Sequence, residues 1–312
     1  MAILSIPTCL GGLAAAVIAM KVIGTALVYL VPSQLHRYLH AENGRPAWAL
    51  VTGASDGIGK AFSHELAGRG FNVVLHGRNP AKLEHVQTEL QAAHPAREFR
   101  ILVADATNCA PDVFKDIVNR LSDIYLTVLV NNVGGEASGY KTLDEHTCNE
   151  STITVTVNAL FPTLLLNALV PVLARNGPAL ILNVGSLLDR GLPLFSSYGG
   201  SKSYMRVLSE SLTREMMMTG RDVTVLYLRI GQTTGVSHTH TPQTLFMPDA
   251  TKMARAALAR VGCGRMVVVP YWGHALMAAL MDSLPSRLAD IFFCRAMTKL
   301  REEWLSKQRK KE

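Results

Sequence analysis

The sequence predicts an α/β fold in which helices cover both faces of a doubly wound, seven-stranded parallel sheet. From Trp48 onward, short apolar runs alternate with longer stretches of helical length. Several runs are continuously apolar rather than alternating in polarity, which is typical of strands buried on both faces. The predicted strands are Trp48–Val51, Asn72–Leu75, Arg100–Val103, Leu126–Val130, Ala179–Val184, Val223–Leu228 and Met266–Val269.

The composition is that of a globular protein with an additional apolar segment. With 312 residues, of which 48% are hydrophobic, the chain can bury one large core or two small ones. Its mean hydropathy of +0.19 is high for a fully soluble protein. The five cysteines are scattered and form no C-x-x-C pair, so we expect a reducing compartment, no disulfide framework and no metal site.

The net charge of +7 does not indicate a nucleic-acid partner. Much of it gathers in the C-terminal tail, at Lys307, Arg309, Lys310 and Lys311, where it is typical of a solvated or membrane-proximal end. The basic residues form no patch interleaved with aromatic side chains, so we expect no nucleic acid among the partners.

An apolar N-terminal helix is predicted to anchor the chain in a membrane. Leu10–Val31 is long enough to span a bilayer core of roughly 30 Å. Residues 1–45 are therefore assigned to a membrane anchor and linker, with Pro32–Pro46 as the polar linker. Lys21 near the middle of the span would cost about 3 kcal/mol, so a shallow or hairpin-like membrane association is the alternative.

Basic residues after the apolar segment and at the C-terminus suggest the cellular location of the protein. Arg37 and Arg45 follow the apolar segment and no basic residue precedes it, which favours a cytoplasmic main domain. The last four residues, Arg309–Glu312, resemble a dilysine endoplasmic-reticulum retrieval signal without matching it strictly. We therefore expect the protein to be located at the endoplasmic reticulum membrane.

Ser151–Asn158 is rich in β-branched residues and would be a strand by propensity, but its place between the fourth and fifth strands predicts a helix. Residues 271–312 carry two apolar stretches of helical length, interrupted at Leu284 and Pro285, and a basic tail. This C-terminal extension either packs on the domain, or forms a substrate lid or a second membrane contact.

A glycine-rich turn, TGASDGIG at Thr52–Gly59, directly follows the first strand and opens a helix. Such glycines let the backbone approach a pyrophosphate at the positive end of the helix dipole. The G-x-x-x-G-x-G spacing is weak evidence alone, but its position between strand and helix predicts a dinucleotide site. The candidate cofactor-binding residues here are Gly53, Ser55, Asp56, Gly57, Ile58 and Gly59.

The residues after the second and third strands indicate which dinucleotide binds. HGRN at His76–Asn79 contains no acid to bind a ribose 2′-hydroxyl, and Arg78 is placed to bind a 2′-phosphate. NADP is therefore favoured over NAD, although Arg78 is alternatively an exposed charge without a ligand. Asp105 is a candidate to accept from the adenine amino group, or else a helix or turn cap.

The segment SLLDRGLPLFSSYGGSK, from Ser186 to Lys202, carries groups suited to carbonyl reduction. Tyr198 and Lys202 are four residues apart and lie on one face if the segment is helical. A nearby ammonium favours the phenolate and lowers the pKa of a tyrosine, while Ser186 could hydrogen-bond the substrate carbonyl. Alone, a Y-x-x-x-K spacing also arises by chance in many helices. Asn131–Gly134, NNVG, could stabilise the sheet edge beside the cofactor or simply make a turn.

Together the motifs resemble the short-chain dehydrogenase/reductase family. TGASDGIG, NNVG, Asn158, Ser186 and the Tyr198-to-Lys202 motif occur in that family's order and rough spacing, from about Ala47 to Pro270. The apolar N-terminal segment, Arg78 and the C-terminal extension resemble its membrane-bound 17β-hydroxysteroid dehydrogenases and very-long-chain 3-oxoacyl-CoA reductases.

This resemblance implies a Rossmann fold, with residues 46–270 as the NADP-binding reductase domain and the following roles. Tyr198 would protonate the carbonyl oxygen, and Lys202 would lower the tyrosine pKa and hold the nicotinamide ribose. Ser186 would orient the carbonyl, and Asn158 would fix a proton-relaying water. Asn131 would form part of the cofactor-side wall, and the loop containing Gly231 and Thr233 would contact the nicotinamide carboxamide.

Two departures from the family pattern affect the substrate side. Ser186 precedes Tyr198 by one residue fewer than the commonest spacing, so the serine is expected to be slightly displaced or the loop shorter. Ile230 stands where the family usually has the proline of a Pro-Gly pair, so we expect the following loop to be freer than usual.

The predicted function is NADPH-dependent reduction of a ketone on a lipophilic substrate to a secondary alcohol. The substrate would be a 3-oxoacyl-CoA or a steroid-like ketone, with a polycyclic or polyketide ketone of specialised metabolism as an alternative. A non-catalytic nucleotide-binding scaffold is a further alternative, which the presence of all four polar site residues disfavours. The resemblance also implies a homodimer through the helix that bears Tyr198, unless the C-terminal extension blocks it.

Overall fold

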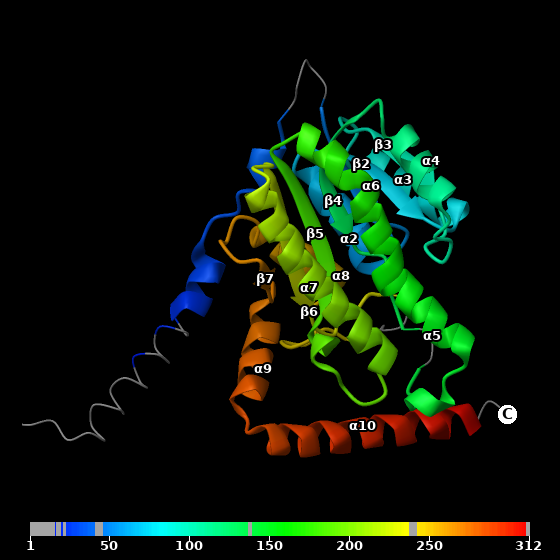
Figure 1. Ribbon diagram of the computed structural model, residues 1–312, viewed down its shortest axis with the longest axis vertical. Coiled ribbons are helices and arrows are strands. Elements are labelled where there is room, and N and C mark those ends of the chain that lie inside the picture. Colours follow the sequence, from blue (N-terminus) through cyan, green and yellow to red (C-terminus); the bar gives the residue numbers. More distant parts are fainter. Residues whose placement is uncertain are drawn as a thin grey trace, which may run out of the picture.

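A computed structural model describes residues 16, 20, 23–40, 46–136, 139–236 and 242–309. Its centre is a seven-stranded, fully parallel sheet in the order β3-β2-β1-β4-β5-β6-β7 (Figure 1). The strands are β1 Ala47–Thr52, β2 Asn72–Gly77, β3 Phe99–Val103, β4 Tyr125–Asn131, β5 Ala179–Ser186, β6 Val223–Ile230 and β7 Val267–Val268. All seven predicted strands are confirmed.

Helices cover both faces of the sheet, as predicted. One face carries α2 Gly57–Gly68, α3 Pro80–Ala93 and α8 Ala250–Ala259, and the other carries α4 Pro111–Arg120, α6 Phe161–Arg175 and α7 Ser196–Met218. Strand β1 shows the alternation: Ala49 and Val51 pack into the first core, and Trp48 and Leu50 into the second. Every residue of β1 is buried, which explains its unbroken apolar run.

The order of the strands fixes where a ligand can bind. From β1 the chain moves outward to β2 and β3, then returns to place β4 on the other side of β1. The carboxyl ends of β1 and β4 therefore border the switch point at which parallel α/β sheets bind ligands. The glycine turn leaves β1 at this edge.

The stretch Ser151–Asn158 is helical, as predicted against its propensity. Helix α5, Cys148–Val155, begins with a capping box in which the Thr147 and Glu150 side chains bond each other's backbone amides. It continues through a π-helical turn, η3 Thr156–Leu160, into α6. Among the described residues, Cys148–Arg175 is the helix long and apolar enough to cross a membrane, but 56% of its most apolar window is buried. We attribute this apolarity to packing against the sheet.

The N-terminal segment is only partly described. Residues 23–30 are helical, but much of the predicted anchor, Leu10–Val31, lies outside the described residues. A polar linker was predicted over Pro32–Pro46, but two residues of this stretch are buried. Leu35 and Tyr38, in the 3-10 turn η1 Leu35–Tyr38, are only 4% and 2% exposed. Three residues apart, they lie on one side of the turn and pack into the core.

Tyr38 also bonds the sheet: its hydroxyl donates to Thr224 Oγ1 at 2.8 Å, and Thr127 donates to its carbonyl at 2.8 Å.

The C-terminal extension forms two helices, α9 Trp272–Ser283 and α10 Ser286–Arg309, which separate at Leu284 and Pro285 as predicted. Helix α9 packs on the domain through Gly273 and His274. Helix α10 buries none of its described residues and crosses beneath η2, Leu143–Glu145, where Arg301 pairs with Glu145 (Figure 1). The packing alternative therefore describes α9, whereas α10 is peripheral.

The burial of Tyr38 gives a test of this N-terminal packing. We expect Tyr38→Ala to lower the free energy of unfolding by about 3–5 kcal/mol, because it removes a buried aromatic side chain. Urea unfolding followed by tryptophan fluorescence measures the change. Leu30→Ala is the control, since Leu30 is 75% exposed and should change stability by less than about 0.5 kcal/mol. Equal, small changes in both variants would contradict the packing.

Candidate active site

The glycine turn at the end of β1 has a backbone conformation and a close packing that require glycine. Gly53 and Gly57 have φ angles of +66° and +54°, a region that favours glycine. A Cβ atom on Gly59 would lie 2.1 Å from the Gly53 carbonyl oxygen, so only glycine fits there. Asp56 caps α2, accepting from Gly57 N at 2.6 Å. With Ser55 and Ile58, these residues form a glycine-rich turn at the N-terminus of α2, the kind of position at which helix amides bind a dinucleotide pyrophosphate.

An asparagine after β4 fastens this turn to the other half of the sheet. Asn132 Nδ2 donates to Thr52 O at 2.9 Å, and the Asn132 amide donates to Thr52 Oγ1 at 2.9 Å. Asn131, for which a place in the cofactor-side wall remains a prediction, is 4% exposed, and its side-chain amide donates to Asn183 Oδ1 of the neighbouring strand at 3.0 Å. Side chains alternate along a strand, so only the exact end of β4 decides which asparagine faces the turn.

Asn158 and Lys202 meet at Gly134. Asn158 Oδ1 accepts from Gly135 N at 3.1 Å, and its Nδ2 donates to Gly135 O at 2.6 Å. Lys202 Nζ donates to the Val184 carbonyl at 3.0 Å. A Cβ atom on Gly134 would lie 2.6 Å from Asn158 Oδ1 and 3.1 Å from Lys202 Nζ. The π-helical turn presents Asn158 here, and such turns are common at functional sites.

Ser186 and Tyr198 are brought together despite their short spacing. Ser186 ends β5, and its Oγ accepts from Leu188 N at 3.1 Å, capping the turn η4, Leu187–Arg190. The Ser186 hydroxyl also hydrogen-bonds the Tyr198 phenol, which lowers the tyrosine pKa. Lys202 Nζ lies 5.6 Å from the centroid of the Tyr198 ring. The four predicted polar residues therefore occupy one site.

The direction of the Tyr198 pKa shift is opposite to the predicted one. Burial raises the pKa of Tyr198, the Glu136 carboxylate raises it further, and only the Ser186 hydrogen bond opposes them. The same burial lowers the pKa of Lys202 to about 8, because a side chain only 5% exposed loses its hydration. Lys202 is thus driven towards its neutral form and does not compensate for the burial of the phenol.

Arg78 and Asp105 follow β2 and β3 at the same edge. Both side chains are exposed. Asp105 Oδ1 accepts from Thr107 N at 2.9 Å, so the turn-capping alternative is realised. Arg78 directly precedes Asn79, which caps α3 by accepting from Lys82 N. Contacts of Arg78 and Asp105 with a cofactor remain predictions.

The loop after β6 is more firmly held than predicted. Gly231 N donates to His274 Nδ1 at 3.0 Å, and Thr233, 5% exposed, donates to Gly231 O at 3.2 Å. The loop also reaches the glycine turn, because a Cβ atom on Gly57 would lie 3.0 Å from Val236 Cγ1. Without the proline this loop was expected to be freer than usual, but His274, which no sequence motif marks, restrains it.

A buried ion pair, also missed, supports the turn after Ser186. Asp189 is 4% exposed and accepts from Arg229 Nη2 at 2.7 Å and from Arg229 Nε at 2.9 Å. The pair joins η4 to the end of β6 in a bidentate contact. No sequence signal marks it, since an Asp-Arg pair in a loop is usually solvated.

Aromatic residues lie beside Tyr198. The rings of Tyr140 and Phe195 are 5.7 Å apart, and those of Phe195 and Tyr198 are 6.5 Å apart. Trp304 of α10 packs against Gly139, where an added Cβ would lie 3.2 Å from its ring. The C-terminal extension therefore reaches a loop beside the site.

A family model described as short chain dehydrogenase matches residues 47–243. A very-long-chain 3-oxoacyl-CoA reductase of Caenorhabditis elegans is 34% identical over 251 residues, covering 78% of this chain and 77% of that protein. A very-long-chain 3-oxoacyl-CoA reductase of Pyricularia oryzae is 32% identical over 238 residues, covering 74% of this chain and 71% of that protein.

A solved short-chain dehydrogenase of Sphingobium yanoikuyae, in complex with NADPH, has a TM-score of 0.61 and 26% identity, covering 77% of this chain and 97% of that chain. The family match ends before α9, so His274 lies beyond it.

The lowered pKa of Lys202 predicts a pH dependence of stability. Between about pH 8 and the ordinary lysine value of 10.5, the unfolded chain binds more protons than the folded one, so stability rises with pH. From pH 8 to 9.5 the rise should be about 2 kcal/mol, and Lys202→Met should lack it. Denaturant unfolding of the unliganded protein measures it. Lys115→Met, exposed on α4, should retain the rise; superimposable curves for wild type and Lys202→Met would contradict the prediction.

Proposed function

Because the chain belongs to the short-chain dehydrogenase family, we propose that it is an NADPH-dependent ketoreductase that converts a ketone on a lipophilic substrate to a secondary alcohol. The observation that carries this proposal is the meeting of Asn158, Ser186, Tyr198 and Lys202 beside the glycine turn. NADPH, when bound, supplies the hydride. A non-catalytic scaffold would have no use for this set of side chains.

The cofactor preference rests on both ends of the dinucleotide site. The glycine turn offers backbone amides to the pyrophosphate, and Arg78 offers a guanidinium to the 2′-phosphate. Gly231 and Thr233 border the nicotinamide side at the end of β6. The absence of an acid at His76–Asn79 disfavours NAD.

The chain's own groups handle the proton. Tyr198 donates its phenolic proton to the carbonyl oxygen, while Ser186 hydrogen-bonds that oxygen and orients it. The raised pKa of Tyr198 keeps the phenol protonated at neutral pH, which suits reduction because the alkoxide is a far stronger base. Lys202 and Asn158, which meet at Gly134, lie where protons can be returned to Tyr198.

A 3-oxoacyl-CoA is the substrate class best supported. The two similar reductases are named for it, and the aromatic residues beside Tyr198 suit a lipophilic chain. A steroid-like, polycyclic or polyketide ketone is the competing class, since aromatic walls also accept fused rings. Turnover of representative ketones from each class distinguishes them.

We also propose membrane association, at the endoplasmic reticulum and with the catalytic domain in the cytoplasm. Exposed apolar side chains on three elements outside the main domain support it. They are Leu27 and Leu30 of the N-terminal helix, Leu276 and Leu280 of α9, and Ile291 and Phe292 of α10. A lipophilic substrate would reach the site from such a surface.

A homodimer through α7 is a further part of the proposal. Tyr204 and Val207 on this helix are 49% and 56% exposed, and Val155 and Leu160 next to it are 45% and 44% exposed. A second copy of the chain would cover these side chains.

Turnover with NADPH and a panel of 3-oxoacyl-CoAs, steroid ketones and polyketide-like ketones tests the function. We expect reduction of 3-oxoacyl-CoAs, and a fall in kcat of about 10²- to 10⁴-fold in Tyr198→Phe with unchanged NADPH affinity, because the general acid is lost. Tyr204→Phe, on the same helix, is the control and should retain full activity. Undiminished turnover in Tyr198→Phe would refute the assignment, and turnover of steroid ketones alone would refute the substrate class.

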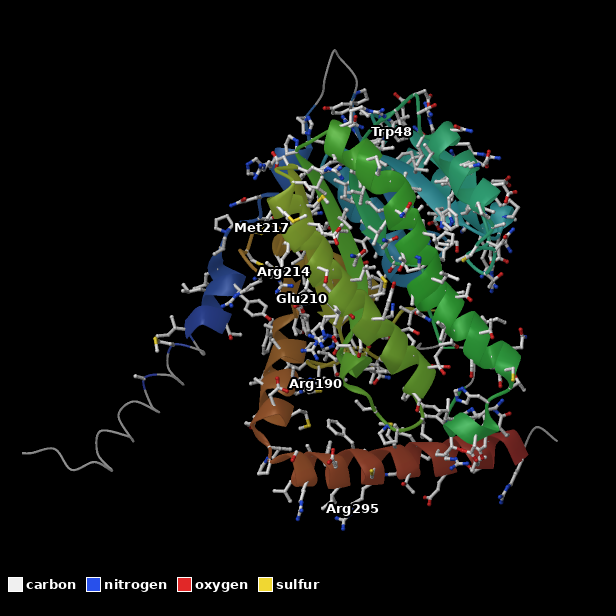
Figure 2. All side chains as sticks on the ribbon, in the orientation of Figure 1. Trp48, Arg190, Glu210, Arg214, Met217 and Arg295 are labelled. Carbon is white, nitrogen blue, oxygen red and sulfur yellow. The ribbon has the colours of Figure 1, made fainter. Side chains whose placement is uncertain are left out.

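Arg78 gives a separate test of cofactor choice. We expect Arg78→Ala to raise the dissociation constant for NADPH by roughly 10- to 100-fold while leaving that for NADH nearly unchanged, since only NADPH carries the 2′-phosphate. Fluorescence titration measures both constants. Arg214→Ala, an exposed arginine of α7 labelled in Figure 2, should change neither. An equal loss for both nucleotides would contradict a contact with the 2′-phosphate.

A further inference from the structure

His274 is a fully buried histidine in the first turn of α9, with an exposed fraction of 0%. Its Nδ1 accepts from the Gly231 amide at 3.0 Å. Because Nδ1 accepts, the ring proton lies on Nε2, which is 3.1 Å from both the Gln232 and the Phe246 carbonyl oxygens. One neutral imidazole therefore holds three backbone groups from two separate segments.

The surroundings of His274 are closely fitted. A Cβ atom on Gly231 would lie 2.9 Å from the imidazole, and one on Gly273 would lie 2.6 Å from the Leu245 carbonyl oxygen. The Tyr271 ring meets the imidazole edge-on at 5.3 Å. Two glycines thus permit the close approach that the hydrogen bonds require.

The segment held by His274 leads directly to the dinucleotide site. Gly231 and Gln232 are the first residues after β6, and the same loop contacts Gly57 of the glycine turn through Val236. Ile230 precedes it where the family usually has proline. A proline would fix its own φ angle and so restrict the start of the loop. In this chain the restraint comes from a distant helix instead.

The other end of α9 contacts the opposite side of the site. Asp282, in its last turn, forms an ion pair with Arg190 of η4, the turn that Ser186 caps. Arg190 lies beside the lower part of α9 in Figure 2. Helix α9 is therefore attached both to the loop after β6 and to the turn η4.

We propose that His274 is a positioning residue that holds Gly231 and Gln232 in the conformation that binds the nicotinamide end of NADPH. The proposal rests on the proposed function, because it takes this loop to be part of the cofactor site. It assigns α9, which lies beyond the family match, to the cofactor site rather than to the membrane alone. His274 does not touch reacting atoms and acts only through the loop.

Substitutions of His274 in the full chain separate positioning from packing. His274→Phe keeps a ring but removes all three hydrogen bonds. His274→Asn can still accept from the Gly231 amide through Oδ1, and His274→Gln can still donate to the carbonyls through Nε2. His94→Phe, at the opposite edge of the sheet, is the matched control. The measurements are the dissociation constant for NADPH by fluorescence titration, KM and kcat for reduction, and the melting temperature.

We expect His274→Phe to raise the dissociation constant and KM for NADPH roughly tenfold, because the loop that it releases would have to be ordered again when NADPH binds. His274→Asn should recover most of this affinity, because it restores the acceptor for Gly231, and His274→Gln should recover less. The control should bind NADPH like the wild type. If His274→Phe does not fold, comparing the NADPH affinities of His274→Asn and His274→Gln tests the proposal.

An affinity for NADPH within twofold of the wild type in all folded His274 variants would overturn the proposal, even with lower melting temperatures, since a packing role alone affects stability. Equal affinities of the Asn and Gln variants would also overturn it. Failure of the wild-type protein to bind NADPH would instead refute the proposed function. The two failures are therefore distinguishable.

Discussion

The hydroxyl of Thr52 holds the two halves of the sheet in register at the edge where the site forms. It accepts from the amides of Asn132 and Val133 at 2.9 and 3.0 Å, so the turn after β1 cannot move independently of the segment after β4. Gly134 follows directly, and Asn158 and Lys202 pack against it. The glycine turn and the segment that packs against Asn158 and Lys202 are therefore joined through Thr52.

Burial of polar groups is the second constraint, and it rigidifies the site. Lys202 is held by the Val184 carbonyl, and Asp189 is neutralised by Arg229. Charges in such surroundings are tolerated only where partners are fixed, and removing one partner leaves an unpaired buried group. These pairs keep Ser186 and Tyr198 in a defined geometry, and electrostatic effects are strong in a site with few movable dipoles.

The sequence was sufficient for the sheet, because buried parallel strands leave continuous apolar runs, and for the helix at Ser151–Asn158, because topology outweighs propensity there. It also identified the four polar side chains, which the structure brings together. It failed where a property depends on packing in three dimensions. The burial of Tyr38 and the direction of the Tyr198 pKa shift both follow from neighbours distant in the chain. His274 and the ion pair of Asp189 with Arg229 lack any local motif and belong to this class.

Helix α9 contacts one border of the site through His274 and the other through Asp282. The helix therefore connects the loop after β6 to the turn η4. Leu276 and Leu280 on the same helix face outward, and α10 continues from its end. A surface that contacts these exposed side chains would therefore contact a helix that is attached to both loops.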